Sequence, residues 1–372
     1  MAAYILRRFL LLIPTLFGIM AISFAIVQLA PGGPVEKVIA QLTGTDVSAT
    51  ARISGSGGDL VGQRLAQTSG DTTRYRGSQG LDPEFIKKLE KQFGFDKPPL
   101  ERFWLMMKSF ATFDFGESYY RNVPILTLIG EKMPVSISLG IWLTLVSYLI
   151  SIPLGIKKAV NDGNTFDVWT SAVIVVGYAV PGFLFGIFLI VLFAGGSVWN
   201  LFPLRGLWSE QYSHVSTWAW LTDPRGMLDY AWHLVLPLTA LVLGAFANTT
   251  MLTKNCFLDE IRKQYVTTAR MKGLNERQVL YGHVFRNAML LVIAGFPGAF
   301  IGAFFTGSLL IEQIFSLDGL GLLGFESVIN RDYPVVFATL YIFSLFGLLI
   351  GLLSDLTYTW IDPRIDFETR EV

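Results

Sequence analysis

Six long apolar runs alternate with polar segments along the chain. Each run has at least 20 residues and contains no Asp, Glu, Lys, Arg or His; the runs are Phe9–Leu29, Pro134–Ile156, Val168–Ala194, Leu234–Thr253, Ala288–Ile311 and Pro334–Ser354. A helix needs roughly 20 mostly apolar residues to cross about 30 Å of hydrocarbon. The pattern predicts an all-α membrane protein with six transmembrane helices.

Composition agrees with this prediction. Apolar residues make up 52 % of the 372 residues and charged residues only 16 %, and the mean hydropathy is +0.49. A water-soluble globule of this size is far less apolar. The first run is long for the core of a signal peptide, and Gln28, Ala30 and Pro31 stand where a cleavage site would end, so we expect it to be a retained helix.

Positive residues gather in three of the short segments that flank the runs; the segment 31–133 also contains many, but it is too long for charge to set its side. Those in the three short segments are Arg7 and Arg8 before the first run, Lys157 and Lys158 after the second, and Lys254, Arg262, Lys263, Arg270, Lys272, Arg277 and Arg286 between the fourth and fifth. All three segments fall on one side if six helices alternate across the membrane. The positive-inside rule then places that side, with both chain termini, in the cytoplasm.

The spacing of the runs divides the chain into parts. We expect a first transmembrane helix (1–30), an extracytoplasmic segment (31–133), a five-helix core (134–356) with a cytoplasmic loop (254–286), and a cytoplasmic tail (357–372). Residues 43–80 are rich in Gly, Ser and Thr with hardly an aromatic residue, which is typical of a flexible insert.

The part of the extracytoplasmic segment after the insert has helical signals. Asp82 is a candidate N-cap with Pro83 in the first turn, and Phe85, Leu89 and Phe93 recur at helical spacing. These features predict short amphipathic helices on the outer surface of the membrane.

The inventory of reactive residues is sparse. Apolar runs without ionisable groups argue against a proton relay or an active site inside the bilayer, and the chain has no G-x-x-x-x-G-K-[ST] phosphate loop. The single cysteine, Cys256, excludes an internal disulfide, and His214, His233 and His283 lack metal-ligand spacing. We therefore expect no metal site and no cofactor on this chain. If the protein moves a solute uphill, the energy must come from another polypeptide.

Several apolar runs contain proline and small residues, such as Pro181 with Gly182 and Gly186. Such residues allow close helix packing and kinks, which fits an ordinary helix bundle as well as a bundle that rocks around a central path. Tyr178, Asn248 and Thr306 are the candidates for lining such a path.

The basic segment between the fourth and fifth runs has helical periodicity. Ile261, Tyr265 and Ala269 recur every four residues, Gly273 follows as a C-terminal stop, and Asn275-x-x-Gln278 is a capping-box pattern. The pattern predicts a helix, a glycine turn and a second helix. Basic segments beside a membrane often only fix topology and contact anionic headgroups. A DNA-binding helix-turn-helix is disfavoured, because a short loop tied to the bilayer at both ends could hardly enter a major groove.

The same segment resembles the EAA loop of one family, the permeases of ATP-binding-cassette (ABC) importers. The residues that fit its oligopeptide and dipeptide permease B branch are Tyr265, Val266, Ala269, Lys272, Gly273, His283, Arg286 and Asn287. Other matching stretches are ILRRFLLLIPTLFG, LAPGGP, FDFGES, IEQIFSLDGLGLLG, INRDYPV and DPRIDF. The resemblance covers nearly the whole chain except the insert, and is greatest for the Yej-type B permeases of importers for peptides and microcin C.

This resemblance implies a type I ABC importer permease fold in the bacterial inner membrane, importing peptides or microcin C-like compounds. The EAA loop forms a coupling helix in a groove of the ATP-binding subunit, here about Leu258 to Asn275. The coupling contact is thereby assigned to Arg262, Tyr265, Thr267, Thr268, Ala269, Arg270, Lys272 and Gly273. Ala269 and Gly273 are expected to allow close contact. Thr267 stands where the general loop begins with Glu, so no role of that glutamate is carried over.

The resemblance also implies partners. They are a second homologous permease, two cytoplasmic ATP-binding subunits or domains that hold ATP and Mg, an extracytoplasmic substrate-binding protein, the lipid bilayer and the peptide substrate, with no nucleic acid. The chain itself is then a transport subunit and no enzyme. Two alternatives remain at this point, a membrane-integral enzyme and a passive channel.

In the segment between the fifth and sixth runs, Glu312, Asp318, Arg331 and Asp332 surround a glycine turn. They predict either a solvated loop or a contact with the substrate-binding protein or a gate.

Overall fold

The computed structural model describes residues 2–29, 33–35, 38–39, 84, 90, 95–196, 198–212, 223–305 and 309–361. These residues fall into two compact units. Unit 1 contains Met1–Phe9, Lys132–Leu323 and Phe346–Val372, and unit 2 contains Leu10–Glu131 and Gly324–Leu345. The predicted insert (43–80) and the predicted N-cap at Asp82 lie outside the described residues.

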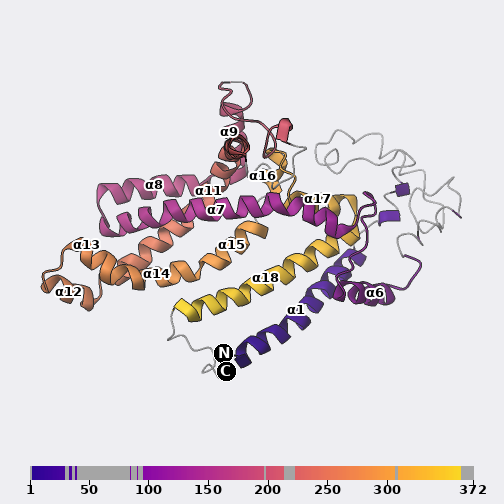
Figure 1. The fold of residues 1–372 in the computed structure, drawn as a ribbon, viewed down its shortest axis with the longest axis horizontal. Coiled ribbons are helices and arrows are strands. Elements are labelled where there is room, and N and C mark those ends of the chain that lie inside the picture. Colours follow the sequence, from indigo (N-terminus) through magenta and orange to yellow (C-terminus); the bar gives the residue numbers. More distant parts are fainter. Residues whose placement is uncertain are drawn as a thin grey trace. The chain divides into compact units, whose positions relative to one another are not determined.

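Helices account for most of the described chain (Figure 1). In chain order they are α1 (Ala2–Leu29), α6 (Pro99–Ala111), α7 (Ile125–Val160), α8 (Thr165–Ala179), α9 (Gly182–Phe193), η1 (Glu210–Tyr212), α11 (Pro224–Ile261), α12 (Gln264–Met271), α13 (Glu276–Val279), the π-helix η2 (Leu280–Val284), α14 (Phe285–Ala294), α15 (Phe296–Phe305), α16 (Leu309–Ile314), α17 (Leu320–Asn330) and α18 (Tyr333–Ile361). α6 follows the stretch from Asp82 to Phe93 whose spacing predicts short helices; most of that stretch lies outside the described residues.

Five helical stretches among the described residues are long and apolar enough to cross a membrane, and a sixth is possible if the bent pair of α8 and α9 counts as one span. The five are Tyr4–Leu29, Ile125–Val160, Pro224–Ile261, Glu276–Phe300 and Tyr333–Thr357. Each overlaps one predicted apolar run. The apolar pattern therefore located the long helices correctly.

The third apolar run is not one continuous helix, which corrects the prediction for Val168–Ala194. α8 ends at Ala179, α9 begins at Gly182, and the two helices meet at 94° (Figure 1). Pro181 has no N–H to continue the hydrogen-bond ladder and restricts the residue before it to extended conformations. Val180 accordingly has φ −81° and ψ 120°.

α7 and α11 are longer than a bilayer requires. They contain 36 and 38 residues, or about 54 Å and 57 Å at 1.5 Å per residue, against about 30 Å of hydrocarbon. α11 continues through the predicted loop as far as Ile261. The single helix predicted from Ile261 to Gly273 is therefore wrong: Lys263 is extended, with ψ 150°, and separates α11 from α12.

The core of unit 1 is built around α11, which packs against α8, α9 and α14. α7 approaches α11 so closely at Gly155 that a Cβ there would lie 2.7 Å from the Cβ of Thr253. The carbonyl of Phe246 in α11 also accepts a hydrogen bond of 2.9 Å from the Ser151 hydroxyl of α7. A glycine is thus required where these two long helices cross.

Unit 2 is held together by aromatic side chains and one buried carboxylate. Phe24 of α1 stacks on Phe337 of α18 with ring centroids 5.8 Å apart. Asp332, which precedes α18, accepts hydrogen bonds from the Ser118 hydroxyl at 2.5 Å and the Tyr119 amide at 3.1 Å. Burial raises the pKa of Asp332 above its ordinary value and raises the pKa of Tyr119 to about 12.

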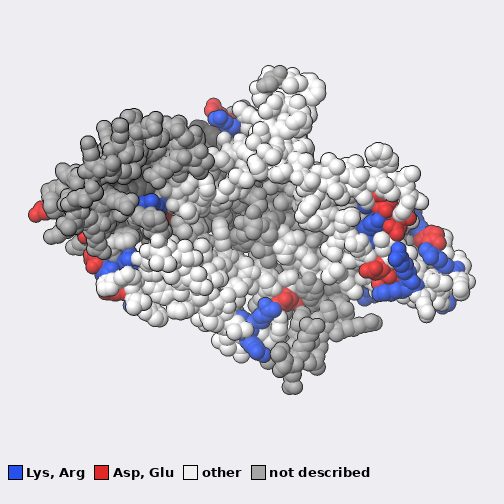
Figure 2. All heavy atoms as spheres, turned by 180° about the vertical axis from the view of Figure 1, so that it is seen from behind, with Lys and Arg blue, Asp and Glu red and all other residues white. Residues whose placement is uncertain are grey.

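Large apolar side chains cover much of the described surface. On α8 and α9 they include Trp169, Val173, Val176, Leu184, Phe188 and Val191, each about half exposed or more. Figure 2 shows wide uncharged areas between small patches of charge. A monomer in water rarely exposes so much contiguous apolar surface, so lipid or a partner must cover it.

Candidate functional site

α12 is a short helix with one buried face and one exposed face. Val266 and Ala269 are 0 % and 6 % exposed and lie three residues apart, as neighbours on one helix face do. The exposed positions are Gln264, Thr267, Thr268, Arg270 and Met271. The Met271 side chain is 83 % exposed. The helix therefore presents a polar face with one apolar side chain near its end.

The buried face of α12 rests on an apolar cluster from several helices. Besides Val266 and Ala269, the buried members are Ile156 and Ala159 of α7, Phe257 of α11, Val279 of α13, Val284 of η2, and Ala288, Met289 and Val292 of α14. α12 thus shares one apolar cluster with α7, α11 and α14, and a displacement of α12 acts on that cluster.

Hydrogen bonds fix the start of α12. The buried carboxylate of Glu260, in the last turn of α11, accepts hydrogen bonds from Lys263 Nζ at 2.5 Å and from the Tyr265 hydroxyl at 2.7 Å. The Asn287 side chain of α14 donates to the same hydroxyl at 3.3 Å. Burial and the neighbouring Glu260 carboxylate raise the pKa of Tyr265, so this phenol stays protonated and joins α11 to α14.

A sharp turn ends α12 as the sequence predicts. Gly273 has φ +84°, a conformation that costs a non-glycine residue roughly 1–2 kcal/mol. Asn275 and Gln278 then form a capping box that starts α13. Arg270 Nε lies 3.0 Å from Glu276 Oε1 across the turn. The predicted glycine turn and second helix are confirmed.

One continuous exposed area results, which we name the α12–α13 surface. Its members are Thr267, Thr268, Arg270, Met271, Lys272, Gly273, Asn275, Arg277, Gln278 and Tyr281, all exposed. Asn275, Arg277, Gln278 and Tyr281 line a shallow hollow in it. In Figure 2 a dense patch of charge lies at the end of the molecule that α12 and α13 occupy in Figure 1.

The structure separates the predicted coupling residues into two groups. Arg262, Thr267, Thr268, Arg270, Lys272 and Gly273 are exposed. Tyr265 is half-buried and Ala269 is buried, so the close packing expected of Ala269 is made with the chain's own helices. Sequence reasoning missed Glu260, whose only signal was an acidic residue two positions before the pair Arg262 and Lys263.

The three candidate path residues are not brought together by any described contact. Tyr178 at the end of α8 is 57 % exposed, and Asn248 on α11 is exposed. Thr306 lies outside the described residues. Their assignment to a transport path stays a prediction.

Glu312, Asp318, Arg331 and Asp332 each have a partner within their own unit. Glu312 is 0 % exposed and accepts a hydrogen bond of 2.7 Å from the Leu322 amide, and Asp318 pairs with Lys132. Within unit 2, Asp332 binds Ser118 and Tyr119, and Arg331 donates to the Gly33 carbonyl at 3.4 Å. The solvated loop expected for Glu312 and Asp332 is therefore wrong, since both carboxylates are buried.

Comparison with known proteins agrees with this architecture. Residues 151–367 match the family described as binding-protein-dependent transport system inner membrane component. The chain is 68 % identical to the peptidoglycan transport system permease protein YejB of Agrobacterium fabrum and 56 % identical to the inner membrane ABC transporter permease protein YejB of Escherichia coli O157:H7, in both cases over the whole of each chain. It is 32 % identical to the oligopeptide transport system permease protein AppB of Bacillus subtilis, over 99 % of this chain and all of that one.

These matches settle the class of protein. A family match over more than half of the chain, together with full-length relatives named as permeases, makes it a transport subunit of the inner membrane and no enzyme. With its helical architecture, the chain belongs to the family of binding-protein-dependent transport system inner membrane components, the permeases of type I ABC importer fold.

Proposed function

We propose that this chain carries peptides or peptide-like compounds inward, driven by an ATP-hydrolysing partner that docks on the α12–α13 surface. The observation that carries the proposal is the division of α12. One face is packed on the ends of α7, α11 and α14, and the other is exposed and polar. A rigid short helix of this kind transmits displacement from a bound partner to the long helices.

The substrate class rests on the relatives. Their names include peptidoglycan and oligopeptide transport systems. Among possible substrates, we propose peptides and microcin C-like peptide conjugates.

The proposed assembly has one copy of this chain, a second homologous permease, two ATP-binding subunits or domains holding ATP and Mg, and an extracytoplasmic substrate-binding protein. The exposed cations of the α12–α13 surface, Arg270, Lys272 and Arg277, suit an acidic rim on the docking partner. In this assembly both termini of the chain and α12 are on the cytoplasmic side.

Site-specific crosslinking tests the docking surface. In a Cys256→Ser background, Thr268→Cys and Met271→Cys should each crosslink to an ATP-binding subunit in membranes containing the whole importer, because both positions are exposed. Val266→Cys is the matched control on the same helix, and should not crosslink because Val266 is 0 % exposed. Absence of a crosslink from both exposed positions, or equal crosslinking from Val266→Cys, would contradict the docking role.

Uptake into vesicles tests the transport role. Vesicles with the complete importer and its binding protein should accumulate labelled peptide only when ATP is supplied, and vesicles with this chain alone should accumulate none. Uptake is measured as peptide retained after filtration, with an ATP analogue that is not hydrolysed as the control. Peptide flux that is equal with and without ATP would instead indicate a passive channel.

A further inference from the structure

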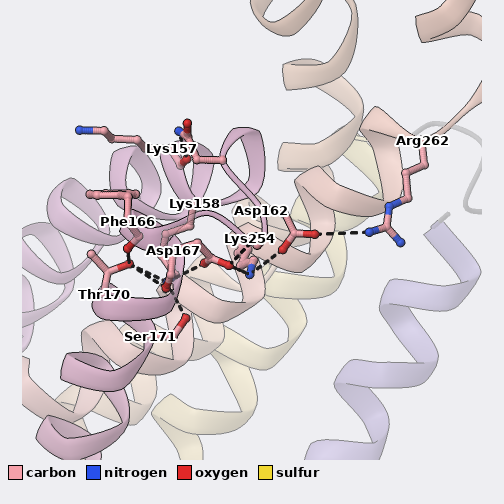
Figure 3. A network of polar contacts seen from close by, with 11 residues as sticks. Lys157, Lys158, Asp162, Phe166, Asp167, Thr170, Ser171, Lys254 and Arg262 are labelled. Carbon is pink, nitrogen blue, oxygen red and sulfur yellow. Dashed lines mark hydrogen bonds and ion pairs between the residues drawn. The ribbon is translucent and has the colours of Figure 1, made fainter.

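Five charged side chains form a continuous line of contacts at one end of unit 1 (Figure 3). We name it the ion-pair line: Lys158 near the end of α7, Asp162 in the α7–α8 turn, Asp167 in the first turn of α8, Lys254 on α11, and Arg262 just after α11. It runs from the α7–α8 hairpin to the residue that leads into α12. None of the five lies within one of the six apolar runs.

The contacts are short over most of the line. Lys158 Nζ lies 2.9 Å from Asp167 Oδ1, and Lys254 Nζ lies 2.7 Å from Asp167 Oδ2. The same Lys254 nitrogen lies 2.9 Å from Asp162 Oδ1. Arg262 Nη2 completes the line at 3.4 Å from Asp162 Oδ2. Lys254 therefore bridges the turn and α8 to α11.

Burial decreases steadily along the line. The exposed fraction of the side chain is 0 % for Lys158, 7 % for Asp167, 11 % for Lys254, 38 % for Asp162 and 70 % for Arg262. Ion pairs weaken as exposure to water increases. The contacts of Asp167 with Lys158 and Lys254 are therefore the strongest of the line. The contact of Arg262 with Asp162 is the weakest, and solvent or movement can break it.

The α7–α8 turn holds Asp162 in a defined place. Gly163 has φ +77°, and its amide donates a hydrogen bond of 3.2 Å to Asp167 Oδ2. The Asn164 amide donates to the Asn161 carbonyl at 3.0 Å. The turn, the first turn of α8 and α11 are thus joined through the single carboxylate of Asp167.

Apolar packing alone would not fix the position of the α7–α8 hairpin relative to the end of α11. α7 also shares the apolar cluster with α12 through Ile156 and Ala159, but apolar contacts are non-directional. Ion pairs between fixed helix ends define one relative position. The ion-pair line therefore gives the hairpin one defined position relative to the end of α11.

We propose that Asp162 and Lys254 are positioning residues that make the α7–α8 hairpin follow α12 when its partner moves it. The inference rests on the proposed docking of an ATP-hydrolysing partner on α12. A movement of α12 would then reach the hairpin through the ion-pair line, in addition to reaching α11 and α14 through the apolar cluster. The moving hairpin includes α8, which carries Tyr178 next to the 94° break.

The test uses the complete importer in vesicles, with ATP hydrolysis and peptide uptake measured on the same sample. Asp162→Asn keeps the shape of the side chain and removes its charge, at a position that is 38 % exposed and so tolerant of change. Peptide taken up per ATP hydrolysed should fall about 2- to 30-fold, the range of mutational effects on coupling between sites. Asp162→Glu should restore much of the ratio. Asp259→Asn, the same exchange at an exposed position on α11 outside the line, should leave it unchanged.

Two further readouts separate the possible results. The melting temperature and the crosslink from Thr268→Cys should both stay unchanged in the Asp162→Asn variant. An unchanged ratio of uptake to hydrolysis, or a fall explained by a lower melting temperature, would overturn the inference. Absence of the crosslink from both Thr268→Cys and Met271→Cys with native Asp162 present would instead contradict the proposed docking.

Discussion

Replacement of Lys158 by methionine is expected to destabilise the protein by about 3–5 kcal/mol, the usual cost of removing one partner of a buried ion pair. Lys158 Nζ contacts the Asp167 carboxylate, the Asp167 carbonyl at 2.9 Å, and the hydroxyls of Thr170 and Ser171 at 2.8 and 2.7 Å. Methionine fills the space and satisfies none of these acceptors. Asp167 would then depend on Lys254 alone for charge compensation.

The neighbouring lysine supplies a matched control. Lys157 is exposed and its nitrogen lies 4.5 Å from the centroid of the Phe166 ring, a contact worth about 0.5–1 kcal/mol at an exposed site. Lys157→Met should therefore lower the melting temperature of the detergent-solubilised protein slightly, and Lys158→Met by several degrees more. Equal melting temperatures for the two variants would show that the buried ion pair contributes little.

Those two lysines also show where sequence reasoning reaches its limit. Both were interpreted as positive residues that fix topology, because they follow an apolar run. In the structure only Lys157 is exposed, and Lys158 is fully buried. The difference depends on whether a side chain points toward α8, and the hairpin that brings α8 alongside α7 is a tertiary feature that no local pattern encodes.

The long helices were predictable because lipid imposes a strong and simple requirement on composition. The break before Pro181 was visible in the sequence as a proline and was interpreted as a kink. Its angle depends on the packing around it: Gly182 lies so close to α11 that a Cβ would be 3.0 Å from the Ala240 carbonyl. Helix bounds in the coupling segment were less predictable, since no proline or glycine marks the extended residue Lys263.

The candidate site was predictable in outline and less so in detail. Glycine and capping-box signals are local, so the turn at Gly273 and the start of α13 could be read from spacing. The role of Tyr265 could not, because its position on a helical stripe indicates packing while its hydroxyl binds Glu260 and Asn287. The sequence shows that a tyrosine is present, but it does not show which distant side chains its hydroxyl binds.

Replacement of Gly319 by alanine should destabilise the protein, because the space is already filled by a buried carboxylate. A Cβ at Gly319 would lie 2.6 Å from Cδ and Oε1 of Glu312. Glu312 is 0 % exposed, so its side chain cannot swing into solvent, and it accepts a hydrogen bond of 2.7 Å from the Leu322 amide in the first turn of α17. Overpacking costs about 1–3 kcal/mol, and an acceptor left unsatisfied adds about 1–3 kcal/mol.

Gly324→Ala is the matched control, because Gly324 lies within α17 and a Cβ there meets nothing within 4 Å. Alanine favours a helix by about 1 kcal/mol over glycine, so this variant should melt at or above the native temperature.

A double-mutant cycle then identifies the cause of the Gly319→Ala effect. If the clash is with the carboxylate, Gly319→Ala should cost much less in a Glu312→Ala background, since that substitution empties the space. Additive losses in the cycle would show that the backbone conformation at residue 319 is responsible. A non-additive cycle instead assigns Gly319 to making room for the carboxylate of Glu312, which accepts the hydrogen bond of the Leu322 amide at the start of α17.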